Sequence, residues 1–78
     1  MLDGIRPGER FYDLGCGDGR LVIAAAQMGA IAVGIDDHQE RLALARANVL
    51  AAGVVAEIRA GDLFEVSLTD ADFVTAYL

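Results

Sequence analysis

The sequence predicts an α/β protein with a doubly wound parallel sheet, and three observations support that fold class. Short apolar runs alternate with helical patterns along the 78 residues. A glycine-rich turn, residues 15–19, separates the first apolar run from the first helical pattern, and strand, glycine turn and helix form the start of a nucleotide-binding unit. Acidic residues, Asp36 and Asp62, follow the next two apolar runs. The order β-α-β-α-β-loop-β implies right-handed crossovers and the strand order 3-2-1-4.

The first two elements flank the glycine turn. Arg10–Leu14 is a short apolar run that contains one acid, and it predicts the first strand. An alanine-rich pattern follows at once, so we expect a helix from about Asp18 or Gly19 to Met28. Gly29 then provides the glycine that commonly ends a helix.

The second strand and helix follow directly. Residues 31–35 read I-A-V-G-I and are almost wholly apolar, which is typical of a parallel strand buried on both faces. Asp37 stands three residues before Glu40, the spacing of a capping box, and we expect it to open a second helix. That helix should end at Gly53.

Two further strands complete the pattern. Residues 54–60 alternate between apolar and charged side chains and predict an edge strand. Residues 73–78 are apolar on both faces, like a central strand, yet nothing in the sequence follows to cover their free edge. Such an edge favours self-association or association with a partner. We interpret residues 1–78 as a partial domain, the N-terminal half of a larger sheet that is cut after strand 4.

Composition excludes several classes of function. The net charge is −6, with 12 acidic and 6 basic residues, and every basic residue is an arginine. No useful basic patch can form, so we expect no nucleic-acid or anionic-membrane binding by this part. The single Cys16 allows no internal disulfide, and with no signal-peptide pattern or membrane span we expect a cytoplasmic protein. A single histidine, His38, makes a metal site unexpected.

The glycine turn predicts a ligand with both an amino and a carboxylate group. Gly15, Gly17 and Gly19 allow positive φ and let a ligand approach the backbone closely. The first N–H groups of the following helix favour a carboxylate or a phosphate. Asp13 can receive an ammonium group, and with Asp18 it would repel a pyrophosphate. The alternative is that the glycines only make a tight connection between solvated acids.

Two acids at later strand ends complete the predicted site. Asp36 can accept hydrogen bonds from both hydroxyls of a ribose, and its alternative role is to cap the second helix, which Asp37 can do instead. Asp62 lies within reach of an adenine amino group if it points into the crevice, and otherwise stabilises a turn.

Cys16 and Tyr77 are weaker candidates. Cys16 lies in the turn near a helix N-terminus, but no partner for nucleophilic catalysis is evident, and a small residue is all that the turn requires. Tyr77 either lines the pocket for the transferred group or belongs to the core. The sequence identifies no catalytic residue.

Three motifs resemble those of class I S-adenosylmethionine-dependent methyltransferases. The run D-L-G-C-G-D-G-R at residues 13–20 is similar to the first motif of that superfamily, V-G-I-D at 33–36 to its acid-tipped second strand, and A-G-D-L at 60–63 to its third. Together with G-D-L-F-E-V and A-D-F-V-T-A-Y-L, the sequence resembles prokaryotic relatives of the mitochondrial protein-lysine methyltransferases that modify an ATP synthase subunit.

The resemblance implies a Rossmann-like fold and S-adenosylmethionine as cofactor, with a methyl group transferred to an unidentified acceptor, such as a protein lysine. The superfamily sheet normally has seven strands and a lead-in helix, whereas this sequence supplies four strands. The residues that the resemblance assigns to the cofactor are Asp13, Gly15, Cys16, Gly17, Gly19, Asp36, Asp37, Asp62 and Leu63, with Tyr77 near the methyl group.

Two other functions remain open at this point. A dinucleotide-binding domain for NAD would need a third glycine where Arg20 stands, and it would place a pyrophosphate among acids. A non-catalytic half-domain would pair its open fourth strand with a partner or a second copy. A missing C-terminal half would also remove the acceptor side, so residues 1–78 alone could bind the cofactor without turnover.

Overall fold

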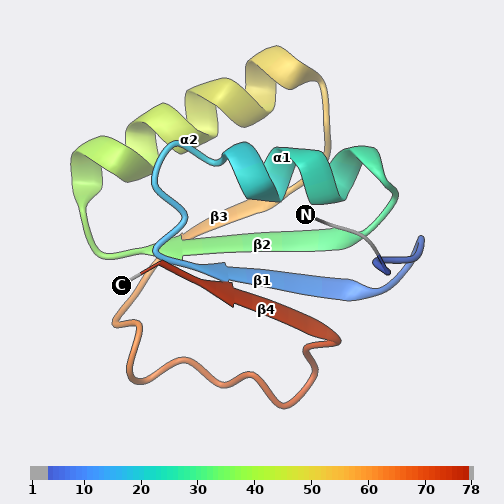
Figure 1. The fold of residues 1–78 in the computed structure, drawn as a ribbon. Coiled ribbons are helices and arrows are strands. Elements are labelled where there is room, and N and C mark those ends of the chain that lie inside the picture. Colours follow the sequence, from blue (N-terminus) through green and yellow to red (C-terminus); the bar gives the residue numbers. More distant parts are fainter. Residues whose placement is uncertain (1–3, 78) are drawn as a thin grey trace.

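The computed structural model describes residues 4–77, and its four strands form one parallel sheet in the order β3-β2-β1-β4. This order and the α/β class confirm the prediction. The carboxyl ends of all four strands lie on the same side of the molecule (Figure 1). The elements in chain order are β1 Arg10–Leu14, α1 Arg20–Gln27, β2 Ile31–Asp36, α2 Gln39–Ala52, β3 Glu57–Ala60 and β4 Phe73–Ala76.

The two central strands bury side chains on both faces of the sheet. On one face Phe11 and Ala32 join a core cluster with residues of α1 and α2. On the other face Tyr12 of β1 pairs in register with Val33 of β2, and both are at least 95% buried. This double burial explains why β2 reads as a continuous apolar run rather than an alternating one.

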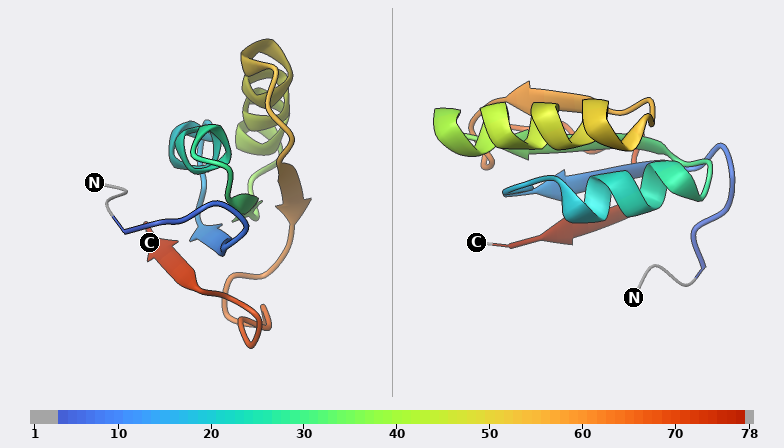
Figure 2. Two further views of the ribbon diagram at one scale, coloured as in Figure 1. Left: turned by 90° about the vertical axis from the view of Figure 1, so that its right-hand side faces the viewer. Right: turned by 90° about the horizontal axis from the view of Figure 1, so that it is seen from above.

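Both helices cover the same face of the sheet, and the segment 61–72 covers the other face (Figure 2). The sequence predicted this segment only as a connection. Its apolar side chains pack against the buried residues of β1 and β2, and the Tyr12 hydroxyl donates a hydrogen bond to Asp70 Oδ1 at 3.0 Å. The packing side chains are Leu63, Val66, Leu68 and Ala71. A segment without helix or strand therefore forms the second layer.

The predicted capping box of α2 is wrong. The residue at the N-cap is His38, and no side chain caps the helix. Asp37 is instead 69% exposed at its side chain, while the carboxylate of Asp36 accepts the backbone N–H of His38 at 2.9 Å. Asp36 therefore bonds the backbone at the residue before α2, and this contact does not cap the helix.

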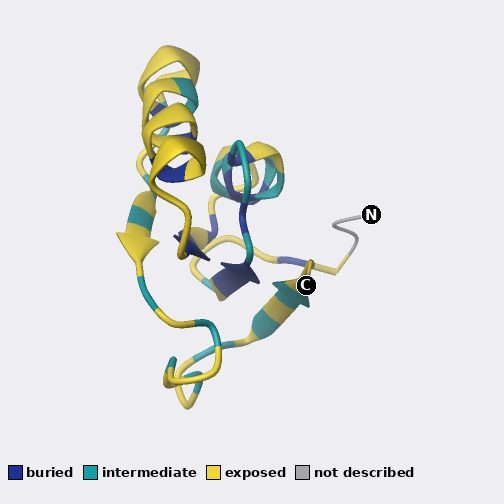
Figure 3. Cartoon of the chain, turned by 90° about the vertical axis from the view of Figure 1, so that its left-hand side faces the viewer, coloured by how far each residue is buried: buried dark blue, intermediate teal, exposed yellow. Residues whose placement is uncertain are grey.

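The outer strands are shorter than predicted. Residue Val55 is 94% exposed and lies outside β3, which begins only at Glu57. β4 ends at Ala76, and the last residue of the predicted strand lies outside the described residues. Among residues 4–77, β4 pairs only with β1, so its outer edge is open, and Figure 3 shows exposed positions along this strand. Neither helix of this part of the chain has the length and apolar character needed to span a bilayer.

Candidate functional site

The glycine turn is fixed onto the carboxyl end of β2. The backbone N–H groups of Gly15 and Cys16 both donate to the carbonyl oxygen of Ile35, at 2.7 and 3.1 Å. Gly34 makes room for this contact, because a Cβ atom there would lie 2.9 Å from the Cβ of Cys16 and 2.8 Å from Val22. The turn can therefore fold back over β2 only if residue 34 lacks a side chain.

Helix α2 supports the turn from the other side. Asn48 donates from Nδ2 to the carbonyl oxygen of Asp18 at 2.9 Å. A Cβ on Gly19 would lie 3.3 Å from that of Ala45, and Gly19 has a φ of +87°. Gly19 thus serves the contact between the turn and α2, and it does not line the crevice described below.

Asp13 is buried beside β4. It is 3% exposed, and it stands in register between Gly34 of β2 and Thr75 of β4. The Thr75 hydroxyl donates to Asp13 Oδ1 at 2.8 Å. Burial raises the pKa of Asp13 above its ordinary value, the hydrogen bond from Thr75 opposes this rise, and the nearby charge of Asp36 adds to it.

Asp36 is the most heavily hydrogen-bonded acid of the site. Its side chain is 1% exposed. Oδ2 accepts the N–H of Gly17 at 3.1 Å, and Oδ1 accepts the N–H of His38 at 2.9 Å. The guanidinium of Arg41 adds Nε and Nη2 contacts at 3.1 to 3.3 Å. Burial alone would raise the pKa of Asp36, but the hydrogen bonds from Arg41, His38 and Gly17 outweigh it and hold the pKa below the ordinary value.

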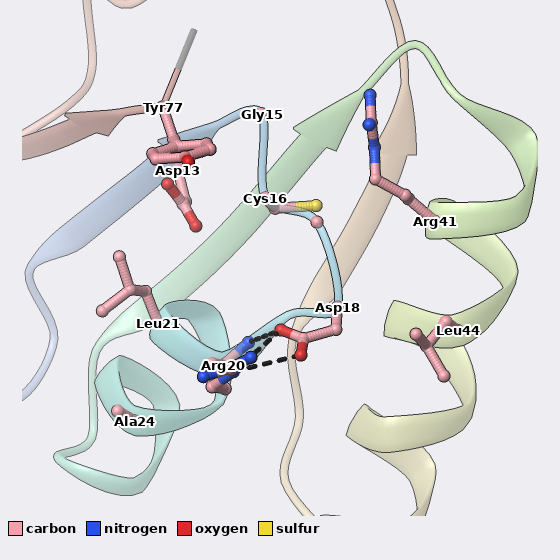
Figure 4. Close-up of a pocket in the computed structure, with 11 residues that line it drawn as sticks. Asp13, Gly15, Cys16, Asp18, Arg20, Leu21, Ala24, Arg41, Leu44 and Tyr77 are labelled. Atoms are coloured by element: carbon pink, nitrogen blue, oxygen red, sulfur yellow. Dashed lines mark hydrogen bonds and ion pairs between the residues drawn. The ribbon is translucent and has the colours of Figure 1, made fainter.

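A crevice at the carboxyl edge of the sheet joins these groups. One cavity of about 840 Å³ is bordered by Asp13 and the glycine turn, and a second of about 330 Å³ is bordered by Asp36 and Leu63. Gly15, Gly17, Arg41 and Tyr77 line both, so the two adjoin. In Figure 4 Arg41 and Tyr77 lie on opposite sides of the turn. The combined volume suits a ligand of cofactor size.

Gly17 faces this open space. A Cβ atom built on Gly17 would meet no other atom within 4 Å, and its φ is +57°. The positive φ favours glycine at this position, and the absence of neighbouring protein atoms leaves room for a ligand to lie against the turn. This observation, together with two acids at the crevice, fits a ligand with an amino group and a ribose.

Cys16 packs into the core and also borders the larger cavity, and its environment does not suit a nucleophile. It is 6% exposed and belongs to the core cluster on the helix face. Burial raises the pKa of the Cys16 thiol to about 11, with further contributions from the charges of Asp36 and Asp13. A thiol with such a pKa is almost entirely protonated at neutral pH.

The remaining predicted residues divide into two groups. Leu63 and Tyr77 line the crevice, and Tyr77 is 85% exposed, so it lies outside the core. Asp37 and Asp62 border neither cavity. The carboxylate of Asp62 accepts the backbone N–H of Phe64 at 2.9 Å, which is the turn-stabilising role that the sequence left as the alternative.

Sequence reasoning missed Arg41, Thr75 and Gly34. Each contacts a predicted acid or the glycine turn, but only through the tertiary structure. One signal was available for Arg41, because it is the first basic residue after the pair of acids at 36 and 37.

Comparison with known proteins gives consistent matches. The family model of the ANTKMT methyltransferase domain matches residues 13–78. A protein-lysine N-methyltransferase of Saccharolobus islandicus is 45% identical over 71 residues, which are 86% of this chain and 44% of that protein. The crystal structure of an RNA methyltransferase from Salinibacter ruber with S-adenosyl-L-homocysteine has a TM-score of 0.92 at 45% identity, over 99% of this chain and 52% of that one.

A second solved structure agrees at lower identity. A SAM-dependent methyltransferase from Thiobacillus denitrificans, also with S-adenosyl-L-homocysteine, has a TM-score of 0.82 at 29% identity, covering 92% of this chain and 31% of that chain. The chain thus spans about half, or less, of the length of these relatives.

Proposed function

The chain belongs to the ANTKMT methyltransferase family of class I S-adenosylmethionine-dependent methyltransferases, and from this premise we propose that its crevice binds the methyl donor for transfer to a protein lysine. The observation that carries the proposal is the convergence of Asp13, Gly17 and Asp36 on one crevice. S-Adenosylmethionine carries an ammonium group, a carboxylate and a ribose diol. These are the groups that such a set of residues can bind.

In the proposed complex each cavity holds a different part of the cofactor. In this proposal the larger cavity, with Asp13 and the glycine turn, holds the amino-acid half of the cofactor. The smaller cavity, with Asp36 and Leu63, holds the ribose and the adenine. The carboxylate of the cofactor would lie near the first turn of α1, where the helix dipole favours negative charge. Asp62 would contribute to the adenine side through the turn that it stabilises.

In this proposal the protein catalyses methyl transfer mainly by positioning the donor relative to the acceptor. The bound cofactor supplies a methyl group on a positively charged sulfur, which a correctly placed nucleophile attacks without further activation of the donor. The residues of this chain hold the donor, and Tyr77, exposed beside Asp13 at the end of β4, borders the side from which an acceptor approaches. The described residues contain no group to which we assign proton removal from the acceptor.

Charge supports a lysine as the acceptor. The net charge of −6 favours the approach of a cationic side chain. The name of the Saccharolobus islandicus relative adds to this support. RNA is the second candidate, because the Salinibacter ruber relative with the same identity is described as an RNA methyltransferase.

The cofactor is tested by calorimetry of the protein with S-adenosylhomocysteine and with NAD. We expect binding of S-adenosylhomocysteine and at least about tenfold weaker binding of NAD, because NAD has no ammonium group to pair with Asp13 and its pyrophosphate would lie near that carboxylate. Tighter binding of NAD would contradict the assignment.

The acceptor requires a second experiment. Radiolabelled S-adenosylmethionine is incubated with the protein and an extract of its own source cells, and the extract is then divided for protease or ribonuclease digestion. Label that resists ribonuclease and is recovered as methyllysine after acid hydrolysis supports the proposal. Label that is released by ribonuclease supports RNA instead. Cofactor binding without transfer to either fraction would support the non-catalytic half-domain.

A further inference from the structure

Arg41 occupies the side of the Asp36 carboxylate that faces the crevice. An ionised carboxylate offers about four acceptor positions. The N–H groups of Gly17 and His38 take one position on each oxygen. Arg41 spans both oxygens, with Nε at 3.3 Å from Oδ1 and 3.2 Å from Oδ2, and Nη2 at 3.1 Å from Oδ1. The carboxylate is therefore fully used by the protein itself.

A ribose diol requires the positions that Arg41 fills. The two hydroxyls of a ribose donate to the two oxygens of one carboxylate. The backbone donors Gly17 and His38 belong to the turn and to the start of α2, and they cannot leave without disturbing the fold. Arg41 lines both cavities and is the donor that a ligand meets from the crevice. Ribose and Arg41 consequently compete for Asp36.

Arg41 also has a second partner within reach. Its side chain is 53% exposed, and Nη2 lies 3.7 Å from Oδ1 of Asp37, one helical turn away. Asp37 is 69% exposed and lines neither cavity. A small rotation of the Arg41 side chain would exchange a contact with Asp36 for a closer one with Asp37, so that its charge stays paired.

We propose that Arg41 competes with the ligand for Asp36: it holds Asp36 in the free protein and moves to Asp37 when a ribose diol binds. The inference rests on the proposed function, because it assumes a ribose-containing ligand in this crevice. A ligand with the diol must displace the Arg41 contacts with Asp36, whereas a ligand without the diol leaves them in place. Arg41 therefore lowers the affinity for ligands that carry both ribose hydroxyls and leaves the affinity for other ligands nearly unchanged.

The first test measures S-adenosylhomocysteine binding by calorimetry for the wild type, Arg41→Ala and Arg46→Ala. Arg46 is a matched control, because it lies on the same helix, carries the same charge and, among the described residues, donates its hydrogen bond to the carbonyl of Ile58, away from Asp36. We expect Arg41→Ala to bind about three- to tenfold more tightly than the wild type, since a half-exposed ion pair no longer has to be broken. Arg46→Ala should bind like the wild type.

Two outcomes of this test distinguish the inference about Arg41 from the proposed function on which it rests. Wild-type binding of S-adenosylhomocysteine with equal or weaker binding by Arg41→Ala would overturn the role of Arg41 and leave the cofactor assignment intact. Absence of binding by all three proteins would overturn the cofactor assignment and the inference with it. Arg41→Lys preserves the charge if the alanine variant folds poorly. Its single ammonium cannot span both oxygens, so it should also bind more tightly than the wild type, by a smaller factor.

The second test asks whether the gain depends on the diol. Adenosine and 2′,3′-dideoxyadenosine are titrated into the wild type and Arg41→Ala, and binding is followed by NMR chemical shifts. The variant should gain affinity for adenosine by the factor seen with S-adenosylhomocysteine, and gain less than twofold for the dideoxy ligand. An equal gain for both ligands would show that Arg41 merely fills space, and would refute the competition.

The third test concerns Asp37 as the second partner. Asp37→Asn should weaken S-adenosylhomocysteine binding about twofold in the wild-type background, because the displaced guanidinium loses its ion pair. The same substitution should have no effect in the Arg41→Ala background. An equal loss in both backgrounds would mean that Asp37 contacts the ligand directly, and the movement of Arg41 to Asp37 would be wrong.

Discussion

Replacing Gly17 with valine should abolish cofactor binding while leaving the fold intact. The side chain at position 17 would extend into the crevice, because a Cβ there meets no protein atom within 4 Å and the residue lines both cavities. Gly53→Val is a matched control. Gly53 also has a positive φ, +69° against +57° for Gly17, and its Cβ would likewise meet nothing within 4 Å, but it lies at the far end of α2.

The two substitutions separate backbone strain from obstruction of the site. A side chain at positive φ costs about 1–2 kcal/mol, and we expect both variants to lose roughly this amount of unfolding free energy. Only Gly17→Val places three carbon atoms where the ligand would contact the turn. We expect its affinity for S-adenosylhomocysteine to fall at least about 100-fold, or about 2.7 kcal/mol, with less than a threefold change in Gly53→Val.

Urea denaturation followed by circular dichroism measures the first quantity, and calorimetry measures the second. If Gly17→Val is folded and binds S-adenosylhomocysteine as well as Gly53→Val does, the ligand does not lie against the glycine turn. The assignment of the crevice as the cofactor site would then be refuted.

Four further predictions follow from the charges, the buried thiol and the open edge of the structure. Asp36→Ala should weaken S-adenosylhomocysteine binding about ten- to hundredfold in calorimetry, since about 1.5–3 kcal/mol of charged hydrogen bonding to the ribose is lost; unchanged affinity would return Asp36 to a purely structural role. The pKa of Asp36 lies below the ordinary 3.8, so its stabilising contribution is present above pH 3.8 and is lost as the pH falls through the lower, folded-state pKa. Arg41→Ala removes the hydrogen bond that lowers the pKa of Asp36 most, so the pKa of Asp36 should rise. Acid unfolding followed by circular dichroism should therefore begin at a higher pH in this variant than in the wild type. Unfolding at the same pH in both proteins would count against a stabilising ion pair between Arg41 and Asp36. Cys16, with a pKa raised to about 11 by burial, should react with iodoacetamide at pH 8 at least about tenfold more slowly in the folded chain than in urea. A polypeptide of residues 1–78 should associate through the open edge of β4, and sedimentation at several concentrations would reveal this, whereas a concentration-independent monomer would contradict it.

The sequence determined the order of the elements and the place of the site. Alternating apolar runs and helical patterns are local signals, and the right-handed crossover rule converts them into the observed strand order. The acids Asp13 and Asp36 could be assigned to the crevice because parallel strands end at one edge of the sheet. Gly17 could be predicted at the crevice because the glycine turn follows directly after the carboxyl end of the first strand.

The tertiary structure decided which groups these acids contact. Asp13 is bonded by Thr75, 62 residues away in sequence, and the segment 61–72 forms a packed layer although it has no periodic pattern. Asp37 does not cap α2, the carboxylate of Asp36 accepts the N–H of His38, and Arg41 is the ion-pair partner of that buried carboxylate. Local sequence patterns predict where a residue lies along a strand, a helix or a turn. The hydrogen-bond partner of a carboxylate depends instead on how the elements pack against one another. The spacing of residues along the chain does not specify that packing.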